Sequence, residues 1–128
     1  MKKYSIELNE RQINEVIDAT DFYSRILSGQ LDDIMIKGIP LSKEINRTKV
    51  RFLLEELKRE MFPELDSNES YGIYNPKLIE KAKILYDIHQ TTRYTYSWSK
   101  EPKGGIQTWF SDPMQASNED LPEVKEIK

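Results

Sequence analysis

No run of apolar residues in this chain of 128 residues is longer than three. Apolar side chains recur instead at intervals of three and four positions, a spacing that places them along one face of an α-helix. This pattern predicts amphipathic helices around a small core, and it excludes a transmembrane helix, which needs about 20 consecutive apolar residues. Hydrophobic residues make up 38% of the chain and charged residues 32%. We therefore expect one domain that gains part of its apolar burial from contacts between subunits.

The first helix is predicted between Asn9 and Ser28. Asn9 and Gln12 have the spacing of a capping box, in which each side chain accepts from the backbone N–H of the other residue. Gly29 follows as the expected left-handed cap. Residues 30–40 then predict a short helical turn or a strand, followed by a break at a glycine and a proline.

Two further helices are predicted after this break. One covers about residues 43–61, where Ser42 is the expected N-cap and Pro63 ends the helix. The other runs over about 76–98, because the Asn-Pro pair at 75–76 combines a cap residue with a proline in the first turn.

Short strands are expected on either side of the helices. Apolar and polar residues alternate over residues 3–8, and residues 106–110 form a second short segment that can pair with them. The predicted fold is therefore mainly α, a three-helix core with short N- and C-terminal β strands, in an oligomer. We assign residues 1–110 to one helical ligand-binding domain and residues 111–128 to a disordered acidic tail.

The net charge of −3 belongs entirely to the tail. Residues 111–128 hold five acidic residues and two lysines, whereas residues 1–110 hold 17 charges of each sign. A neutral domain gives little attraction for long nucleic acid, whose binding depends on many phosphate contacts. A small dianion held by two or more local arginines is still compatible with this balance.

The chain contains no cysteine and one histidine. These counts exclude disulfides, thiol catalysis and cysteine-based zinc sites. The common phosphate-loop, dinucleotide, metalloprotease, calcium and hydrolase motifs are also missing from the sequence. We therefore predict a protein that is not an enzyme and takes no cofactor and no metal. The first residues carry two lysines without an apolar run behind them, which predicts no signal peptide and a soluble cytoplasmic protein.

The end of the third helix is the most informative segment. Its predicted face starts apolar and becomes polar, in the order Leu78, Ala82, Leu85, His89, Arg93 and Tyr96. A buried arginine without a partner is costly, so Arg93 must meet a carboxylate, backbone carbonyls or an anionic ligand. An internal salt bridge is one interpretation, with the candidate partners Asp18, Asp21 and Asp87. A bound nucleotide is the other, because Tyr86 and Trp98 offer surfaces on which a base can stack.

Other residues complete the candidate site. His89 is either a hydrogen-bonded core residue or a donor to a phosphate or a base edge. Arg25, on the flank of the first helix, and Gln30, after the glycine cap, are either solvated or bind a ligand. Tyr71 either packs in its loop or lies beside a helix N-terminus that binds an anion. The candidate ligand-binding residues are therefore Arg25, Gln30, Tyr71, Tyr86, His89, Arg93 and Trp98.

Three segments occur in a recognisable order: YSRILSGQ (23–30), FPELDSNESYGIYNP (62–76) and YDIHQTTRYTYSW (86–98). Together they resemble a family of small proteins encoded by tailed phages, in which a YSR-x-x-x-GQ helix end, a SYGI loop and a DI-x-Q-x-x-R helix recur. The resemblance covers about residues 5–100, and the acidic tail lies outside it.

Within that family the chain is similar to phage anti-CBASS sponges, which sequester the cyclic dinucleotide signal of infected bacteria. The resemblance implies a helical homotetramer in the host cytoplasm that binds ligands such as 3′3′-cGAMP without cleaving them. A cyclic dinucleotide needs cationic or backbone donors for two phosphates and aromatic faces for two bases, and the candidate residues offer both types. The alternative hypothesis is a phage-encoded protein that binds and inhibits a host protein.

Overall fold

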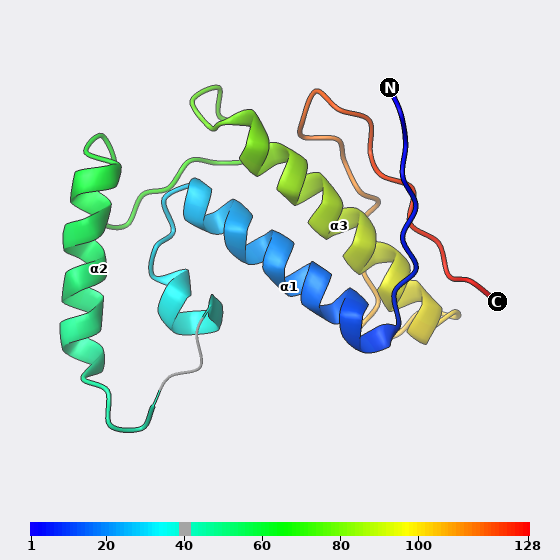
Figure 1. The fold of residues 1–128 in the computed structure, drawn as a ribbon, viewed down its shortest axis with the longest axis horizontal. Helices are drawn as coiled ribbons and strands as arrows, with labels where there is room; N and C mark the ends of the chain where they lie inside the picture. Colours follow the sequence, from blue (N-terminus) through cyan, green and yellow to red (C-terminus); the bar gives the residue numbers. More distant parts are fainter. Residues whose placement is uncertain (39–41) are drawn as a thin grey trace.

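The computed structural model describes residues 1–38 and 42–128 and is mainly helical (Figure 1). Three α-helices, α1 (Glu10–Leu27), α2 (Arg47–Met61) and α3 (Glu80–Lys100), follow in order, with one π-helical turn, η1 (Ile34–Gly38), after α1. None of the helices in the described ranges is long and apolar enough to cross a membrane. The mainly α fold class is confirmed.

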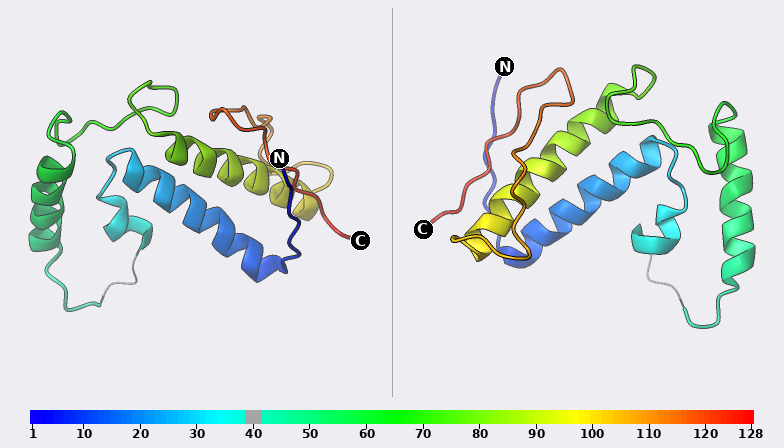
Figure 2. Two further views of the ribbon diagram at one scale, coloured as in Figure 1. Left: turned by 45° about the horizontal axis from the view of Figure 1, so that its top comes forward. Right: turned by 180° about the vertical axis from the view of Figure 1, so that it is seen from behind.

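The body of the molecule is an antiparallel pair formed by α1 and α3, which lie side by side (Figures 1 and 2). At one end, the Ser24 hydroxyl donates to the backbone carbonyl of Ala82 at 3.0 Å. At the other end, the side-chain amide of Asn14 donates to the Tyr96 hydroxyl at 3.2 Å. Ala82 is completely buried, and its single methyl group allows the two backbones to approach closely where they cross.

The predicted ends of α1 are confirmed. Asn9 accepts from the backbone N–H of Gln12, and the Gln12 side chain accepts from the Asn9 N–H, both at 3.0 Å. Gly29 has a φ of +97°, in the left-handed region. The next residue, Gln30, donates its backbone N–H to the Arg25 carbonyl at 2.9 Å and closes the helix end.

The interior of the pair is small and polar. The buried apolar residues of the described chain are Leu31, Leu78 and Ala82. Most other buried positions hold polar or charged side chains, among them Asp21, Ser24, Asp87, His89, Gln90, Thr92 and Ser97. Each such group needs a hydrogen-bond partner to offset its loss of water. The position of α1 against α3 therefore depends on specific polar contacts more than on apolar area.

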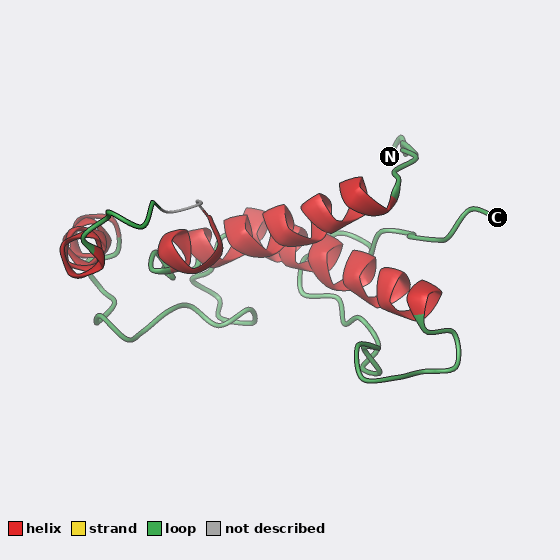
Figure 3. Cartoon of the chain, turned by 90° about the horizontal axis from the view of Figure 1, so that it is seen from below, coloured by secondary structure: helices red, strands yellow, loops and turns green. Residues whose placement is uncertain are grey.

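The second helix lies outside this core, so the predicted three-helix core is wrong. α2 packs along neither α1 nor α3, and it is steeply inclined to both (Figure 3). Its C-terminal end is held to the loop that follows: the ammonium group of Lys58 donates to the carbonyls of Ser67 and Glu69. That loop in turn joins the end of α1, because the Tyr71 N–H donates to the Ser28 carbonyl at 2.8 Å. These contacts fix α2 at its C-terminal end and leave the side with Leu53 and Leu57 exposed.

The start of α2 also differs from the prediction. Asn46, and not Ser42, is the N-cap, and it accepts from the N–H of Lys49 at 3.0 Å. The helix ends just before Pro63, as predicted. Within residues 30–40, the expected helical turn is η1, whereas the proline of the predicted break lies outside the described residues.

The third helix begins at Glu80, later than predicted. The Asn75 carbonyl accepts from the Leu78 N–H at 3.0 Å, and its side chain accepts from the Lys77 N–H at 2.9 Å. The Asn-Pro pair therefore starts a turn that precedes the helix, and the N-cap position is Ile79, which supplies no side-chain cap. The predicted start of this helix at residue 76 is therefore wrong, because the capping side chain of Asn75 belongs to the turn before the helix.

The predicted terminal strands are wrong for the described chain, in which no strand is present. Residues 3–8 run in the open, and the Tyr4 side chain is 90% exposed. Residues 106–110 turn instead onto the end of α3, where the Trp109 N–H donates to the Ser97 hydroxyl at 3.1 Å. A short strand needs a neighbouring strand to pair with. Residues 106–110 are hydrogen-bonded to α3 instead, so neither segment has a partner strand.

The acidic tail, for which the sequence predicts disorder, returns along α3 (Figure 1, orange to red). Its backbone is hydrogen-bonded to α3 side chains at Met114, Ala116 and Ser117, and again at Val124, whose carbonyl accepts from the Thr95 hydroxyl at 3.0 Å. The polar composition of the segment predicts disorder because it offers little apolar burial. The contacts that it makes are hydrogen bonds to polar side chains of α3, which need no apolar residues.

Candidate ligand-binding site

A row of polar side chains on α3 binds residues 109–117, which we call the strap. The row consists of Asp87, Gln90 and Arg93, each three positions apart, and these are the conspicuous polar residues of the DI-x-Q-x-x-R segment. The carboxylate of Asp87 accepts from the backbone N–H groups of Ala116 at 2.8 Å and Ser117 at 3.1 Å, and from the Ser117 hydroxyl at 2.6 Å. Asp87 is only 2% exposed, so these donors replace its water.

Gln90 holds the strap one turn further along α3. Its side-chain oxygen accepts from the Met114 N–H at 3.0 Å, and its side-chain nitrogen donates to the Met114 carbonyl. The strap and α3 together enclose a hollow of about 290 Å³. Its walls are formed by Tyr74, Tyr86, Gln90, Arg93, Tyr94, Trp109, Ser111, Asp112, Pro113 and Met114.

Arg93 is the cation of this hollow. Its guanidinium group lies over the Trp109 ring, 3.6 Å from the ring centroid, and one terminal nitrogen donates to Nε2 of His89 at 3.3 Å. Its Nε is buried and has no hydrogen-bond partner in the described part of the chain. Burial lowers the pKa of Arg93, but a guanidinium stays charged at any ordinary pH.

The salt-bridge interpretation of Arg93 is not supported by this geometry. Among residues 1–38 and 42–128, no carboxylate forms an ion pair with it. Two of the predicted partners are engaged elsewhere: Asp21 pairs with Arg25 and Lys37, and Asp87 holds the strap. Within the described residues, the guanidinium of Arg93 therefore contacts an aromatic face and a neutral imidazole, and the Asp21 carboxylate acts on it only at a distance.

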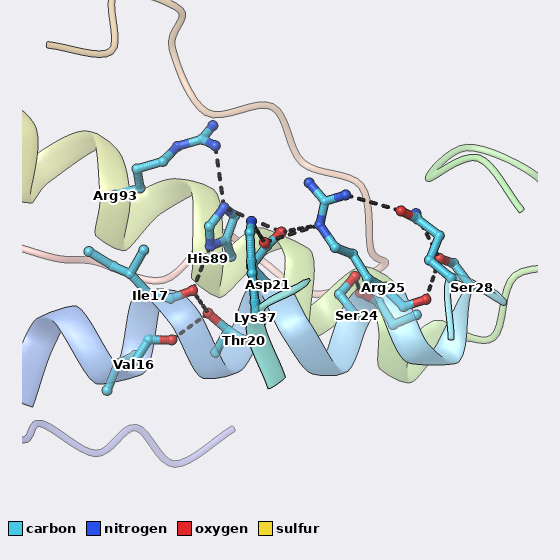
Figure 4. Close-up of polar contacts among 12 residues, drawn as sticks. Val16, Ile17, Thr20, Asp21, Ser24, Arg25, Ser28, Lys37, His89 and Arg93 are labelled. Carbon is cyan, nitrogen blue, oxygen red and sulfur yellow. Dashed lines mark hydrogen bonds and ion pairs between the residues drawn. The ribbon is translucent and has the colours of Figure 1, made fainter. Parts of the chain in front are cut away.

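His89 connects α3 to α1 (Figure 4). Its Nδ1 lies 2.8 Å from the Ile17 carbonyl, and its Nε2 faces the Arg93 guanidinium. A carbonyl can only accept and a guanidinium can only donate, which assigns the proton to Nδ1 and makes the ring neutral. Burial lowers the pKa of His89 and favours the same state. The Asp21 carboxylate, 3.8 Å from Nε2, therefore does not form an ion pair with His89 at neutral pH.

Asp21 is the centre of the second charged cluster. Arg25 places its Nε 3.0 Å from both carboxylate oxygens, and Lys37 donates at 3.0 Å. Burial raises the pKa of Asp21, but the hydrogen bonds from Lys37 and Arg25 outweigh it, so the pKa lies below its usual value. Arg25 also donates to the Gln30 side chain at 3.0 Å. Arg93, His89, Asp21, Arg25 and Gln30 thus form one polar chain, in which neighbours are hydrogen-bonded except for His89 and Asp21, which lie 3.8 Å apart.

The structure brings part of the predicted site together. Tyr86 and Arg93 line the hollow, and His89 supports Arg93 from behind. Arg25 and Gln30 lie at the far end of the polar chain, outside the hollow. There the Gln30 side chain accepts from Arg25 and donates to the Ser28 hydroxyl, at the C-terminal end of α1. The YSR-x-x-x-GQ segment therefore has a clear structural role at the end of α1.

Two predicted residues lie elsewhere. Tyr71 packs edge-on against Phe62, with ring centroids 6.4 Å apart, and its hydroxyl donates to the Glu64 carboxylate. Trp98 supports the strap from the outside, because its indole N–H donates to the Trp109 carbonyl at 2.9 Å. Its ring also packs edge-on against Phe110 at 5.4 Å. Neither side chain lines the hollow.

The sequence reasoning missed the strap residues. Trp109 supplies the ring beneath Arg93, and Asp112 accepts from the Tyr94 hydroxyl, a hydrogen bond that raises the pKa of Tyr94. The assignment of residues 106–110 to a strand and of residues 111–128 to a disordered tail removed this wall from consideration. The sequence did contain one signal for the strap, the three-residue spacing of Asp87, Gln90 and Arg93. This spacing places the three polar side chains together on one face of α3, next to the face that packs on α1.

No protein-family model, curated protein or solved structure matches this chain. The family resemblance therefore stays a prediction that depends on the three sequence segments. In the part of the chain that the structure describes, the hollow combines one cation without a carboxylate partner, several ring faces, and a backbone wall that the polar row holds in place.

Proposed function

We propose that this protein binds cyclic dinucleotides such as 3′3′-cGAMP and sequesters them without cleaving them. The observation that carries the proposal is Arg93, a half-buried cation that borders an aromatic hollow and has no carboxylate partner in the described chain. A phosphate is the ligand group that a guanidinium binds best, through charge-assisted hydrogen bonds. Tyr86 and Tyr94 on the same walls offer ring faces to a base.

The size of the hollow favours a shared site. Its volume of about 290 Å³ falls at the lower limit for small-molecule pockets, which span about 300–1,000 Å³. One nucleotide half of the ligand suits such a space. A cyclic dinucleotide is nearly twofold symmetric, and its second half would occupy the hollow of a second subunit related by the same symmetry. A homo-oligomer, for which the sequence resemblance implies a tetramer, is part of the proposal.

The biological role follows from the resemblance. A protein that removes the signal from the cytoplasm of an infected host prevents the host defence from being activated. Such a sponge acts by stoichiometry, so its site must hold the ligand and needs no nucleophile or metal. We propose this anti-CBASS role for a phage-encoded protein.

Calorimetric titration with a panel of cyclic dinucleotides and cyclic trinucleotides tests the proposal. We expect saturable binding of at least one member, and we expect Arg93→Gln to weaken it by about 10-fold or more, because a hydrogen bond to a charged group contributes about 1.5–3 kcal/mol. Arg11→Gln is the matched control, since Arg11 is an exposed arginine on α1. Absence of binding to every member contradicts the proposal, as does equal binding by the two variants at unchanged melting temperatures.

The fate of the ligand separates a sponge from an enzyme. After the complex is denatured by heat, chromatography should recover the cyclic dinucleotide intact and in a fixed ratio to protein. Recovery of a linear product would show turnover and reject the sponge mechanism.

A second candidate function is the binding and inhibition of a host protein. The exposed apolar side chains of α2, including Leu53 and Leu57, favour it. A stoichiometric host protein retained from a lysate, together with no calorimetric signal for any cyclic nucleotide, would support this alternative. Nucleotide binding that is lost in Arg93→Gln would argue against it.

A further inference from the structure

The apolar side of α2 has no partner within the described chain. Leu53, Leu57 and Met61 are 53%, 45% and 53% exposed, and a shallow hollow of about 370 Å³ lies over Leu53 and Leu57. An isolated helix of 15 residues is marginally stable in water. Within residues 1–38 and 42–128, the contacts that fix α2 lie near its C-terminal end, so a stable α2 needs a further surface against its apolar side.

The charges of α2 are separated along its length. Its N-terminal part carries Arg47, Lys49 and Arg51 and no acidic residue. Its C-terminal part carries Glu55, Glu56 and Glu60, with two basic residues that are already engaged. One is Lys58, whose ammonium group binds loop carbonyls, and the other is Arg59, which lies 3.9 Å from Glu56.

We infer that α2 pairs with α2 of a second copy of this chain in an antiparallel orientation. An antiparallel pair places the basic part of each helix against the acidic part of the other, whereas a parallel pair brings six cations together at one end. The contact is then isologous, with the same apolar patch used by both copies, as in a twofold dimer. Leu53 and Leu57 form its centre.

The loop after α2 covers one side of the helix, so only the other side is open to a second copy. It covers the side of Lys58, so the open side holds Leu53 and Leu57 and is flanked by Lys49 and Glu60. These two charged residues are 11 positions apart, which is close to three full turns, and therefore lie on the same side of the helix. In the antiparallel pair, Lys49 of each copy faces the acidic end of the other copy.

This surface does not involve the nucleotide hollow. α2 projects from one end of the α1–α3 pair, whereas both chain termini lie at the other end (Figure 2). The inference names a contact for the oligomer in the proposed function, and that is the only part of the function on which it rests. It can be tested without any ligand.

The first experiment compares Leu57→Glu with Phe52→Glu by sedimentation equilibrium of the full chain. Phe52 is also exposed, at 54%, but lies five positions away and about 140° around the helix. We expect the wild type and Phe52→Glu to be oligomeric with equal masses. Leu57→Glu should have half that mass and lose at most the part of the helical circular dichroism that α2 contributes, because α2 then has no covering surface. A monomeric wild type overturns the inference, as does a Leu57→Glu variant that retains the full mass.

A charge exchange tests the orientation. Lys49→Glu and Glu60→Lys should each raise the dissociation constant of the pair up to about five-fold, and the double exchange should restore it. Each single change places a favourable charge at its end of the isolated helix, so weaker association cannot come from loss of α2. A double variant weaker than both single variants overturns the antiparallel pairing.

The two proposals fail in different ways. A monomeric wild type that binds a cyclic dinucleotide overturns the α2 contact and leaves nucleotide binding in place. A wild type that dimerises through α2 and binds no cyclic nucleotide supports the contact and rejects the sponge.

Discussion

The α1–α3 body and α2 differ in which side chains are buried and which are exposed. In the body, carboxylates, an imidazole and an amide are buried and paired, and apolar burial is slight. In α2, leucines and a methionine face solvent, and the charges lie along the flanks. Burying polar groups is costly unless they are fully paired, and exposing a row of large apolar groups is unusual for a monomer. The first region therefore supports the proposed ligand site, and the second supports the proposed contact with a second copy of the chain.

Removing the carboxylate that anchors the strap should have the largest effect. Asp87→Ala leaves the N–H groups of Ala116 and Ser117 and the Ser117 hydroxyl without their acceptor. We expect a loss of about 3 kcal/mol in the free energy of unfolding, measured by urea denaturation. Exposed Glu55→Ala, on α2, should change stability by less than about 0.5 kcal/mol. Equal effects from the two variants would mean that the strap does not depend on Asp87.

The joint between the two regions should be the next most sensitive point. Gly29 has a φ of +97°, and a Cβ atom there would lie 2.7 Å from the Leu65 side chain in the loop after α2. Gly29→Ala should cost about 1–2 kcal/mol of unfolding free energy, because L-residues resist the left-handed region. Gly72→Ala is the matched control, since a Cβ there meets nothing within 4 Å. A neutral Gly29→Ala would contradict the left-handed cap.

Local sequence signals predicted the body better than they predicted the connections. The Asn9–Gln12 capping box and the Gly29 cap are decided by residues within one turn of each other, so the sequence was sufficient for α1. The strap depends on pairing between residues about 30 positions apart, such as Asp87 and Ser117. The composition of the tail could not show that polar side chains on α3 would form hydrogen bonds with its backbone.

The error on α2 has a related cause. Its stripe of Val50, Leu53, Leu54, Leu57 and Met61 predicted a core-facing helix, and the stripe exists. Periodicity identifies an apolar face but not what covers it, and α2 contacts the loop that follows it rather than packing along α1 or α3. For the candidate site, the sequence identified Tyr86, His89 and Arg93, but not the opposite wall with Trp109.

The pH dependence of stability should report on the polar chain. Burial holds the pKa of His89 below its ordinary value of 6.5, so on acidification the unfolded chain takes up the proton first. Stability is complete above that ordinary value and falls as the pH drops below it, towards the lower pKa of the folded state. Denaturation of the wild type between about pH 7 and pH 5 should show this gradual loss.

The single histidine makes this test specific. His89→Gln keeps a donor for the Ile17 carbonyl and removes the titrating group, so the difference in pH profile between the two proteins belongs to His89. Proton NMR of the ring should give a pKa below 6.5 in the folded wild type, and a value above it would contradict the neutral tautomer assigned to the Arg93 contact.

The smallest effect in dilute solution is expected from α2, and its dependence on concentration is the informative quantity. Leu57→Ala removes a side chain that is 45% exposed, so within one chain it should cost less than about 0.5 kcal/mol. If a second copy covers this face, the melting temperature of the wild type rises with protein concentration, because association stabilises the folded state by mass action. Leu57→Ala should reduce that slope, whereas Phe52→Ala should keep it. Parallel slopes for all three proteins, with Asp87→Ala still strongly destabilising, would mean that the apolar side of α2 tolerates water and that only the polar body of the molecule needs its partners.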